Sequence, residues 1–69
     1  MKIQYDKTAD AMYIYLKKGK IDKTSKMRDR LNVDLDKRGN ILGLEILSVS
    51  SQIPKSQIGK IEIGIPVSA

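Results

Sequence analysis

The sequence predicts a mainly β fold, an antiparallel β-meander of four to five strands with one short helix at most. Ten isoleucines and only three aromatic residues make the core aliphatic, and β-branched side chains pack well on a pleated sheet. Several segments alternate apolar and polar residues with the period of two that is typical of strands. No window of eleven residues keeps apolar side chains at helical spacing, so long helices are not expected. The alternative is an α+β fold with one short helix, near residues 8–12 or in the C-terminal segment.

Two strands are predicted in the first sixteen residues. Residues 2–5 alternate polar and apolar side chains, and residues 12–16 place aliphatic side chains on one face and Tyr13 and Tyr15 on the other. Aspartate and threonine side chains bond to nearby backbone groups, which favours a turn or a single helical turn over residues 6–11.

The middle of the chain is predicted to hold one irregular edge and two regular strands. Residues 21–30 contain only two apolar side chains, so we expect an irregular, solvent-facing edge strand or loop. Residues 31–35 alternate cleanly, and the hairpin turn that follows contains Gly39, which is placed for a left-handed conformation. Residues 41–49 have apolar side chains at odd and at even positions, interrupted by Gly43 and Glu45. Such a pattern is typical of a central strand buried on both faces.

Residues 1–50 are expected to form the core, and residues 51–69 a C-terminal extension that adds an edge strand to the same domain. Pro66 cannot donate a ladder hydrogen bond, which restricts this strand to an edge. An apolar edge readily pairs with another chain, so we expect an interface here, either swapped into a second copy or receiving a partner strand. The apolar side chains on one face of this strand are Ile61, Ile63, Ile65 and Val67.

The chain is short for a self-sufficient core. At 69 residues, a domain hides only about 60 % of the surface that its unfolded chain exposes. Small domains usually need disulfides, a metal ion or a partner subunit, but cysteine and histidine are both absent. We therefore expect a homo-oligomer or a bound protein partner. Tyr13 and Tyr15 are assigned to the same interface, because tyrosine buries its ring while its hydroxyl stays in contact with water.

The sequence predicts neither a membrane span nor a secretory signal. No apolar run approaches the roughly 20 residues that a membrane span requires, and the first residues lack the apolar segment of a signal peptide. The absence of cysteine fits a reducing compartment, so the expected location is the cytoplasm.

No catalytic residues, cofactor or metal ion are predicted, and we do not expect an enzyme. A serine–histidine nucleophile is excluded because there is no histidine. Residues 34–45 have the spacing of an EF-hand calcium loop, but Arg38 occupies a position that normally supplies an oxygen, and both flanks alternate as strands. A hairpin turn explains the same residues, with Asp34 and Asp36 pointing into water.

The excess positive charge lies in the first 30 residues. They hold nine basic and four acidic side chains, whereas the remaining residues hold four of each. Such a patch attracts polyanions, and aromatic side chains beside cations can stack bases. A solvated hairpin that keeps the protein soluble is the alternative explanation. The basic residues from Lys17 to Arg30 are Lys17, Lys18, Lys20, Lys23, Lys26, Arg28 and Arg30.

Several sequence blocks, in this order and spacing, resemble a known family. They are residues 1–6, 9–14, 34–36 with Gly39, and 42–47. Over roughly residues 1–50 the chain resembles the small prokaryotic family labelled domain of unknown function 2283. The resemblance implies no catalytic or ligand residues. Genes of the family are sometimes suspected of forming toxin–antitoxin-like pairs, so the resemblance implies a second gene product as partner. This chain departs from the family in its basic middle segment and in the β pattern of its tail.

The leading hypothesis is therefore a self-associating protein-interaction module, one member of such a pair, with a protein partner encoded nearby. The alternative is weak, sequence-tolerant nucleic-acid binding through the basic region Lys17–Arg30.

Overall fold

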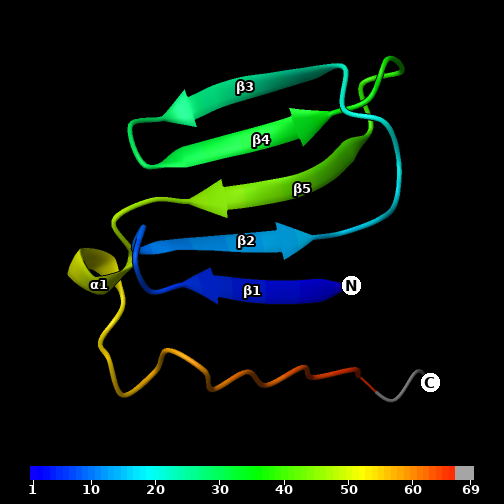
Figure 1. Ribbon diagram of the computed structural model, residues 1–69. Helices are drawn as coiled ribbons and strands as arrows, with labels where there is room; N and C mark the ends of the chain where they lie inside the picture. Colours follow the sequence, from blue (N-terminus) through cyan, green and yellow to red (C-terminus); the bar gives the residue numbers. More distant parts are fainter. Residues whose placement is uncertain (67–69) are drawn as a thin grey trace.

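A computed structural model describes residues 1–66 of the chain. It contains one sheet and one short helix (Figure 1). Strands occupy 41% of the described residues and the helix 6%, which confirms the mainly β prediction. The elements are β1 (Lys2–Asp6), β2 (Ala11–Tyr15), β3 (Lys23–Arg28), β4 (Leu31–Leu35), β5 (Ile41–Ile46) and α1 (Val49–Gln52).

The strand order is β1-β2-β5-β4-β3, and every neighbouring pair is antiparallel. The order differs from a continuous meander, because residues 16–22 carry the chain from β2 to the far edge and β5 then returns between β2 and β4 (Figure 1). The prediction that β5 is the central strand is confirmed, but its expected burial on both faces is wrong, because Ile41 is exposed and Leu44, Glu45 and Ile46 are only partly buried. Segment 21–30 forms the edge strand β3, whose pairing register shifts between Lys26 and Arg28. The most apolar strand takes the middle and the most polar strand an edge, which buries the most apolar surface.

The strand registers divide the side chains between an apolar and a polar face, because neighbouring residues of a strand point to opposite sides. Cross-strand partners such as Ile14 and Leu44 share the apolar face, whereas Tyr13 and Glu45 share the polar face. The apolar face includes Ile3, Tyr5, Met12, Ile14, Leu31, Val33, Leu35, Leu42, Leu44 and Ile46, with Lys23 and Ser25 at its β3 rim. The polar face includes Gln4, Tyr13, Tyr15, Thr24, Asn32, Asp34 and Glu45.

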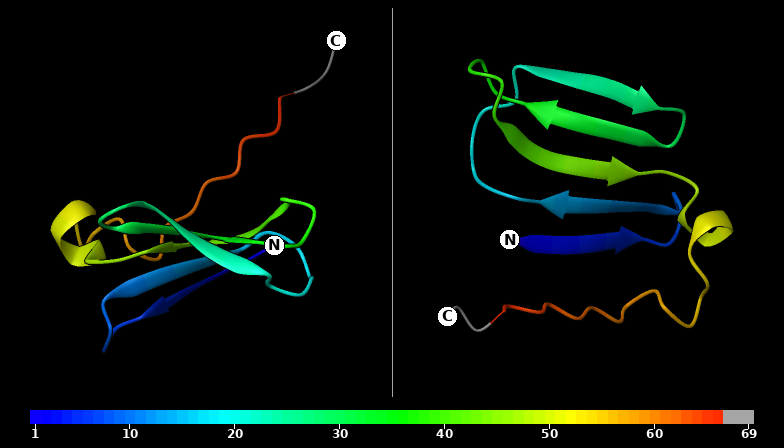
Figure 2. Two further views of the ribbon diagram at one scale, coloured as in Figure 1. Left: turned by 90° about the horizontal axis from the view of Figure 1, so that it is seen from above. Right: turned by 180° about the vertical axis from the view of Figure 1, so that it is seen from behind.

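The apolar face has no second layer packed over it within residues 1–66 (Figure 2). Among those residues, the buried apolar side chains are Val33, Leu42 and Val49. Leu42 lies beside Gly19 of the connection between β2 and β3. The rest of the apolar face, including Ile3 and Ile14, stays partly exposed. A sheet normally buries its apolar face against another layer. Within residues 1–66, the small helix α1 lies at one end of the sheet, where Val49 is fully buried.

Asp10 fixes α1 to the turn between β1 and β2. Its carboxylate accepts hydrogen bonds from the Tyr5 hydroxyl at 2.7 Å, and from the backbone amide and hydroxyl of Ser50 at 3.1 and 2.7 Å. The amide of Val49 donates to the Asp10 carbonyl at 3.0 Å. Asp10 itself adopts a left-handed conformation, with φ of 52°, which aspartate tolerates better than most residues. These bonds set the direction in which the chain leaves the sheet.

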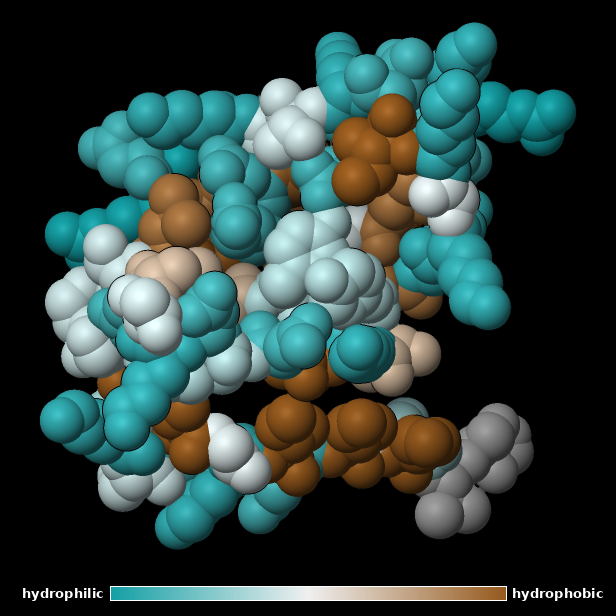
Figure 3. Space-filling view, in the orientation of Figure 1, coloured by the Kyte–Doolittle hydropathy of each residue, from teal (hydrophilic) through white to brown (hydrophobic). Residues whose placement is uncertain are grey.

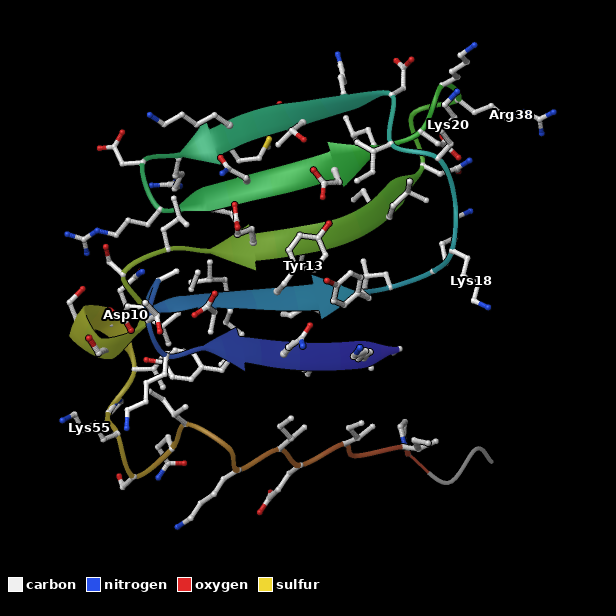
Figure 4. All side chains as sticks on the ribbon, viewed as in Figure 1. Asp10, Tyr13, Lys18, Lys20, Arg38 and Lys55 are labelled. Carbon is white, nitrogen blue, oxygen red and sulfur yellow. The ribbon has the colours of Figure 1, made fainter. Side chains whose placement is uncertain are left out.

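Residues 60–66, here called the tail, are extended but belong to no strand. The side chains of Ile61, Ile63 and Ile65 are 57%, 67% and 82% exposed. The edge strand predicted here is therefore not part of this sheet, and Val67 lies outside the described residues. Figure 2 shows the tail leaving the plane of the sheet toward the back of the view in Figure 1, whereas Tyr13 lies on the front (Figure 4). No helix within residues 1–66 is long and apolar enough to cross a membrane.

Candidate interaction surfaces

A hydrogen-bonded cluster lies at the centre of the polar face. The Tyr13 hydroxyl and the Thr24 hydroxyl both donate to the carboxylate of Asp34, which is only 8% exposed. The prediction that Asp34 points into water is thus wrong. Burial, followed by the hydrogen bond to Asp34, raises the pKa of Tyr13 to about 12.

Gly43 explains how Asp34 becomes buried. Gly43 pairs with Asp34 across β4 and β5, and the Tyr13 ring crosses above it to reach the carboxylate (Figure 4). A Cβ at position 43 would lie 2.6 Å from the Tyr13 hydroxyl oxygen, closer than atoms tolerate. Sequence reasoning missed this cluster, although a glycine inside a central strand often marks such a close approach.

Beside this cluster is a shallow hollow of about 550 Å³, open to solvent and lined in part by Gln4, Tyr13, Tyr15 and Glu45. The two tyrosine rings contact each other, with centroids 4.3 Å apart and planes tilted by 48°. The ammonium of Lys2 lies 5.7 Å from the centre of the Tyr15 ring, where a cation is attracted by the ring face. Both tyrosines therefore lie on the polar face, away from the side of the sheet toward which the tail projects.

The predicted basic region follows the connection after β2 and the outer strand β3. Lys18 and Lys20 lie on the connection, where Lys20 comes near Arg38 (Figure 4). Strands β4 and β5 separate β3 from the tyrosines of β2, so the structure does not bring the cations of β3 and the tyrosines together. Cations on an edge strand also discourage pairing with other strands. The cations of β3 are Lys23, Lys26 and Arg28.

The EF-hand-like stretch forms the β4–β5 hairpin. The carboxylate of Asp36 accepts hydrogen bonds from the amides of Arg38 and Asn40, both at 2.9 Å, and from the Asn40 side chain at 3.0 Å. The bonds from Asn40, the largest cause, and from Arg38 lower the pKa of Asp36. Gly39 has φ of 83°, as the turn prediction requires. No three acidic side chains gather as metal ligands anywhere in residues 1–66.

The apolar face is only partly covered by residues 1–66. Its central side chains are aliphatic, and the polar cluster around Asp34 lies on the other face. The exposed isoleucines of the tail form a continuous apolar row in the space-filling view (Figure 3). Both surfaces present apolar side chains.

Comparison with known proteins places the sheet in a family. No curated protein and no solved structure matches this chain. A family model matches residues 2–50, which include all five strands and the first residues of α1 but not the tail. The chain therefore belongs to the family described as "Protein of unknown function (DUF2283)".

Proposed function

We propose that this protein is a self-associating protein-interaction module, in which the apolar face packs against the same face of a second copy. The observation that supports the proposal is a one-layer sheet whose apolar face is only partly covered by residues 1–66 of its own chain, with Ile3, Ile14 and Leu44 left partly exposed. Two sheets packed face to face, about 10 Å apart, form an ordinary β-sandwich. A second copy supplies the missing layer.

The distribution of charge favours a second copy as the occupant. The apolar face has no charged residue among its central side chains, which are Ile14, Val33 and Leu44. Seven of the thirteen basic residues lie between Lys17 and Arg30, on β3, the connection before it and the turn after it. They lie at the edge of the sheet or in its loops, with Lys23 at the β3 rim of the apolar face, and not at the centre of that face. A two-fold axis places the same patch on both partners, and an aliphatic patch complements itself.

The test compares two substitutions on neighbouring residues of β1 that point to opposite faces. Ile3→Lys places a cation on the apolar face, and Gln4→Lys places the same cation on the polar face. Sedimentation equilibrium between about 1 and 200 µM is expected to give a dimer for the wild type and for Gln4→Lys, and a monomer for Ile3→Lys. A wild type that stays folded and monomeric throughout this range would refute the proposal.

A second measurement covers the case in which Ile3→Lys fails to fold. When folding and association are linked, the melting temperature rises with protein concentration. The wild type is therefore expected to melt at a higher temperature at 200 µM than at 1 µM. An unchanged melting temperature would contradict self-association, whatever the variant does.

The pairing with a second gene product is a finer part of the proposal, supported only by the family resemblance. In a face-to-face dimer the polar face stays outside, with the hollow beside Tyr13 and Tyr15 available to a partner protein. Co-expression with the product of the adjacent gene, followed by purification of a complex of defined mass, tests this part. Tyr15 lines that hollow on β2, and Tyr15→Ser is expected to weaken the complex without changing the dimer.

Nucleic-acid binding is the second candidate, favoured by the concentration of cations along β3 and the connection before it. Phosphate contacts release counterions, so the logarithm of the binding constant would fall steeply with the logarithm of salt concentration. A labelled single-stranded RNA, titrated at low and moderate salt, tests it. No binding at low salt removes this candidate.

A further inference from the structure

We infer that the tail of one copy adds as a sixth strand to the open edge of β1 in a second copy. This inference rests on the proposed self-association and specifies how the two copies are held together. The tail is an extended apolar segment without a partner, and the β1 edge is a row of backbone groups without a neighbouring strand.

The two edges of the sheet differ in how well they accept another strand. The outer strand β3 carries three cations and a register shift between Lys26 and Arg28, and both features hinder the addition of a strand. The outer strand β1 pairs regularly with β2 from Lys2 to Asp6 and contains no proline. The β1 edge is therefore the one that can take a further strand.

The tail has the pattern that this edge requires. Ile61, Ile63 and Ile65 alternate with polar or small residues, so a strand formed by the tail presents one apolar side. Residues 61–65 match the length of β1, and none of residues 61–66 makes a backbone hydrogen bond within the described chain. In the pairing that aligns both apolar sides, the isoleucines extend the apolar face and Glu62 lies beside Gln4 on the polar face.

The position of the tail favours pairing between two copies over pairing within one. The tail runs antiparallel to β1 of its own chain (Figure 1), yet it leaves the sheet plane on the side away from Tyr13 (Figures 2 and 4). That side is where the proposed dimer places the second copy. The bonds of Asp10 to Val49 and Ser50 fix the start of α1, and the turn at residues 55–59 leads from there to the tail.

The size of the interface supports the same conclusion. Five strands about 4.8 Å apart and about 17 Å long present a flat area of roughly 400 Å² per copy. Two such faces give roughly 800 Å², whereas stable interfaces bury about 1,200 Å² or more in total. Two exchanged tails widen both faces and cover one strand edge on each copy, which brings the buried area toward that range.

Disulfide trapping tests the exchange directly, because the chain contains no cysteine. Full-length Gln4→Cys and Glu62→Cys are mixed, denatured, refolded together and oxidised, and mass spectrometry then identifies the linked species. A second mixture, of Lys26→Cys and Glu62→Cys, tests the β3 edge in the same way. We expect the yield of mixed disulfide between positions 4 and 62 to exceed the yield between positions 26 and 62 by about tenfold. Equal trapping at both edges would overturn the inference. A chain carrying Gln4→Cys and Glu62→Cys together that forms only an internal disulfide would also overturn it.

A matched pair of tail substitutions separates this inference from the proposed function. Ile63→Ser removes an apolar side chain from the tail, and Glu62→Ser changes its opposite side. Because a dimer contains two tails, Ile63→Ser is expected to raise the dimer dissociation constant at least tenfold, with Glu62→Ser close to the wild type. Equal dissociation constants for all three proteins would leave the dimer intact and refute the exchange. A monomeric wild type would refute the dimer itself.

Discussion

Gly43→Ala is the substitution whose effect follows most directly from the structure. The backbone of Gly43 is not in the left-handed region, so alanine strains nothing by its own conformation. The added Cβ would lie 2.6, 2.7 and 2.9 Å from the hydroxyl oxygen, Cε1 and Cζ of Tyr13. The ring must therefore swing away and release the carboxylate of Asp34, which is 8% exposed.

The size of the effect follows from two opposing contributions. A hydrogen bond to a charged group contributes about 1.5–3 kcal/mol to stability, and Asp34 would lose the one from Tyr13. Replacing glycine by alanine inside a strand returns roughly 0.5–1 kcal/mol. We therefore expect Gly43→Ala to lower the free energy of unfolding by about 1–2 kcal/mol, although alanine suits a strand better than glycine.

A double-mutant cycle with Tyr13→Phe identifies the mechanism. Tyr13→Phe removes the hydroxyl that donates to Asp34, and it is expected to cost about 1.5–3 kcal/mol. If alanine acts by displacing that hydroxyl, the hydrogen bond is lost only once in the double variant, which then costs about 1.5–3 kcal/mol less than the two single effects together. The assay is urea denaturation followed by circular dichroism, with all four proteins at one concentration. Additivity within about 0.5 kcal/mol would refute the reasoning.

Three further predictions concern Tyr13, Asp10 and β3. Because folding raises the pKa of Tyr13 to about 12, its contribution to stability is present below pH 10 and is lost as the pH rises toward 12. The free energy of unfolding should fall over this interval, and less steeply in Tyr13→Phe. The hydrogen bonds from Ser50, the largest cause, and from Tyr5 lower the pKa of Asp10, so its contribution is present at neutral pH and is lost as the pH falls below 3.8. Asp10→Ala should speed hydrogen exchange at the Ser50 amide at neutral pH. Asp6→Ala is the control, because the Asp6 side chain bonds only the amides of Thr8 and Ala9. Lys23→Thr combined with Lys26→Thr should increase aggregation measured by light scattering, because β3 loses the cations that guard its edge, whereas Lys55→Thr with Lys60→Thr should not.

Local patterns in the sequence determined most of the strands. Alternation of apolar and polar residues marked β1, β2 and β4, because a strand turns successive side chains to opposite faces. Gly39 and the carboxylate of Asp36 marked the β4–β5 turn, since both act within a few residues of backbone. The apolar run at residues 41–49 indicated the central strand. The strand itself ends at Ile46, and the last residues of the run lead through Ser48 into α1.

Only the tertiary structure decided features that depend on residues far apart in the chain. Strand order required β5 to enter between β2 and β4, a choice set by total burial and not by any local pattern. Asp34 is buried because Tyr13, 21 residues away, crosses Gly43 to reach it, and Asp10 bonds Ser50 across 40 residues. The tail has the alternation of a strand but pairs with no other strand within residues 1–66. A strand needs a sheet edge beside it, and the periodicity of a sequence does not tell whether such an edge is there.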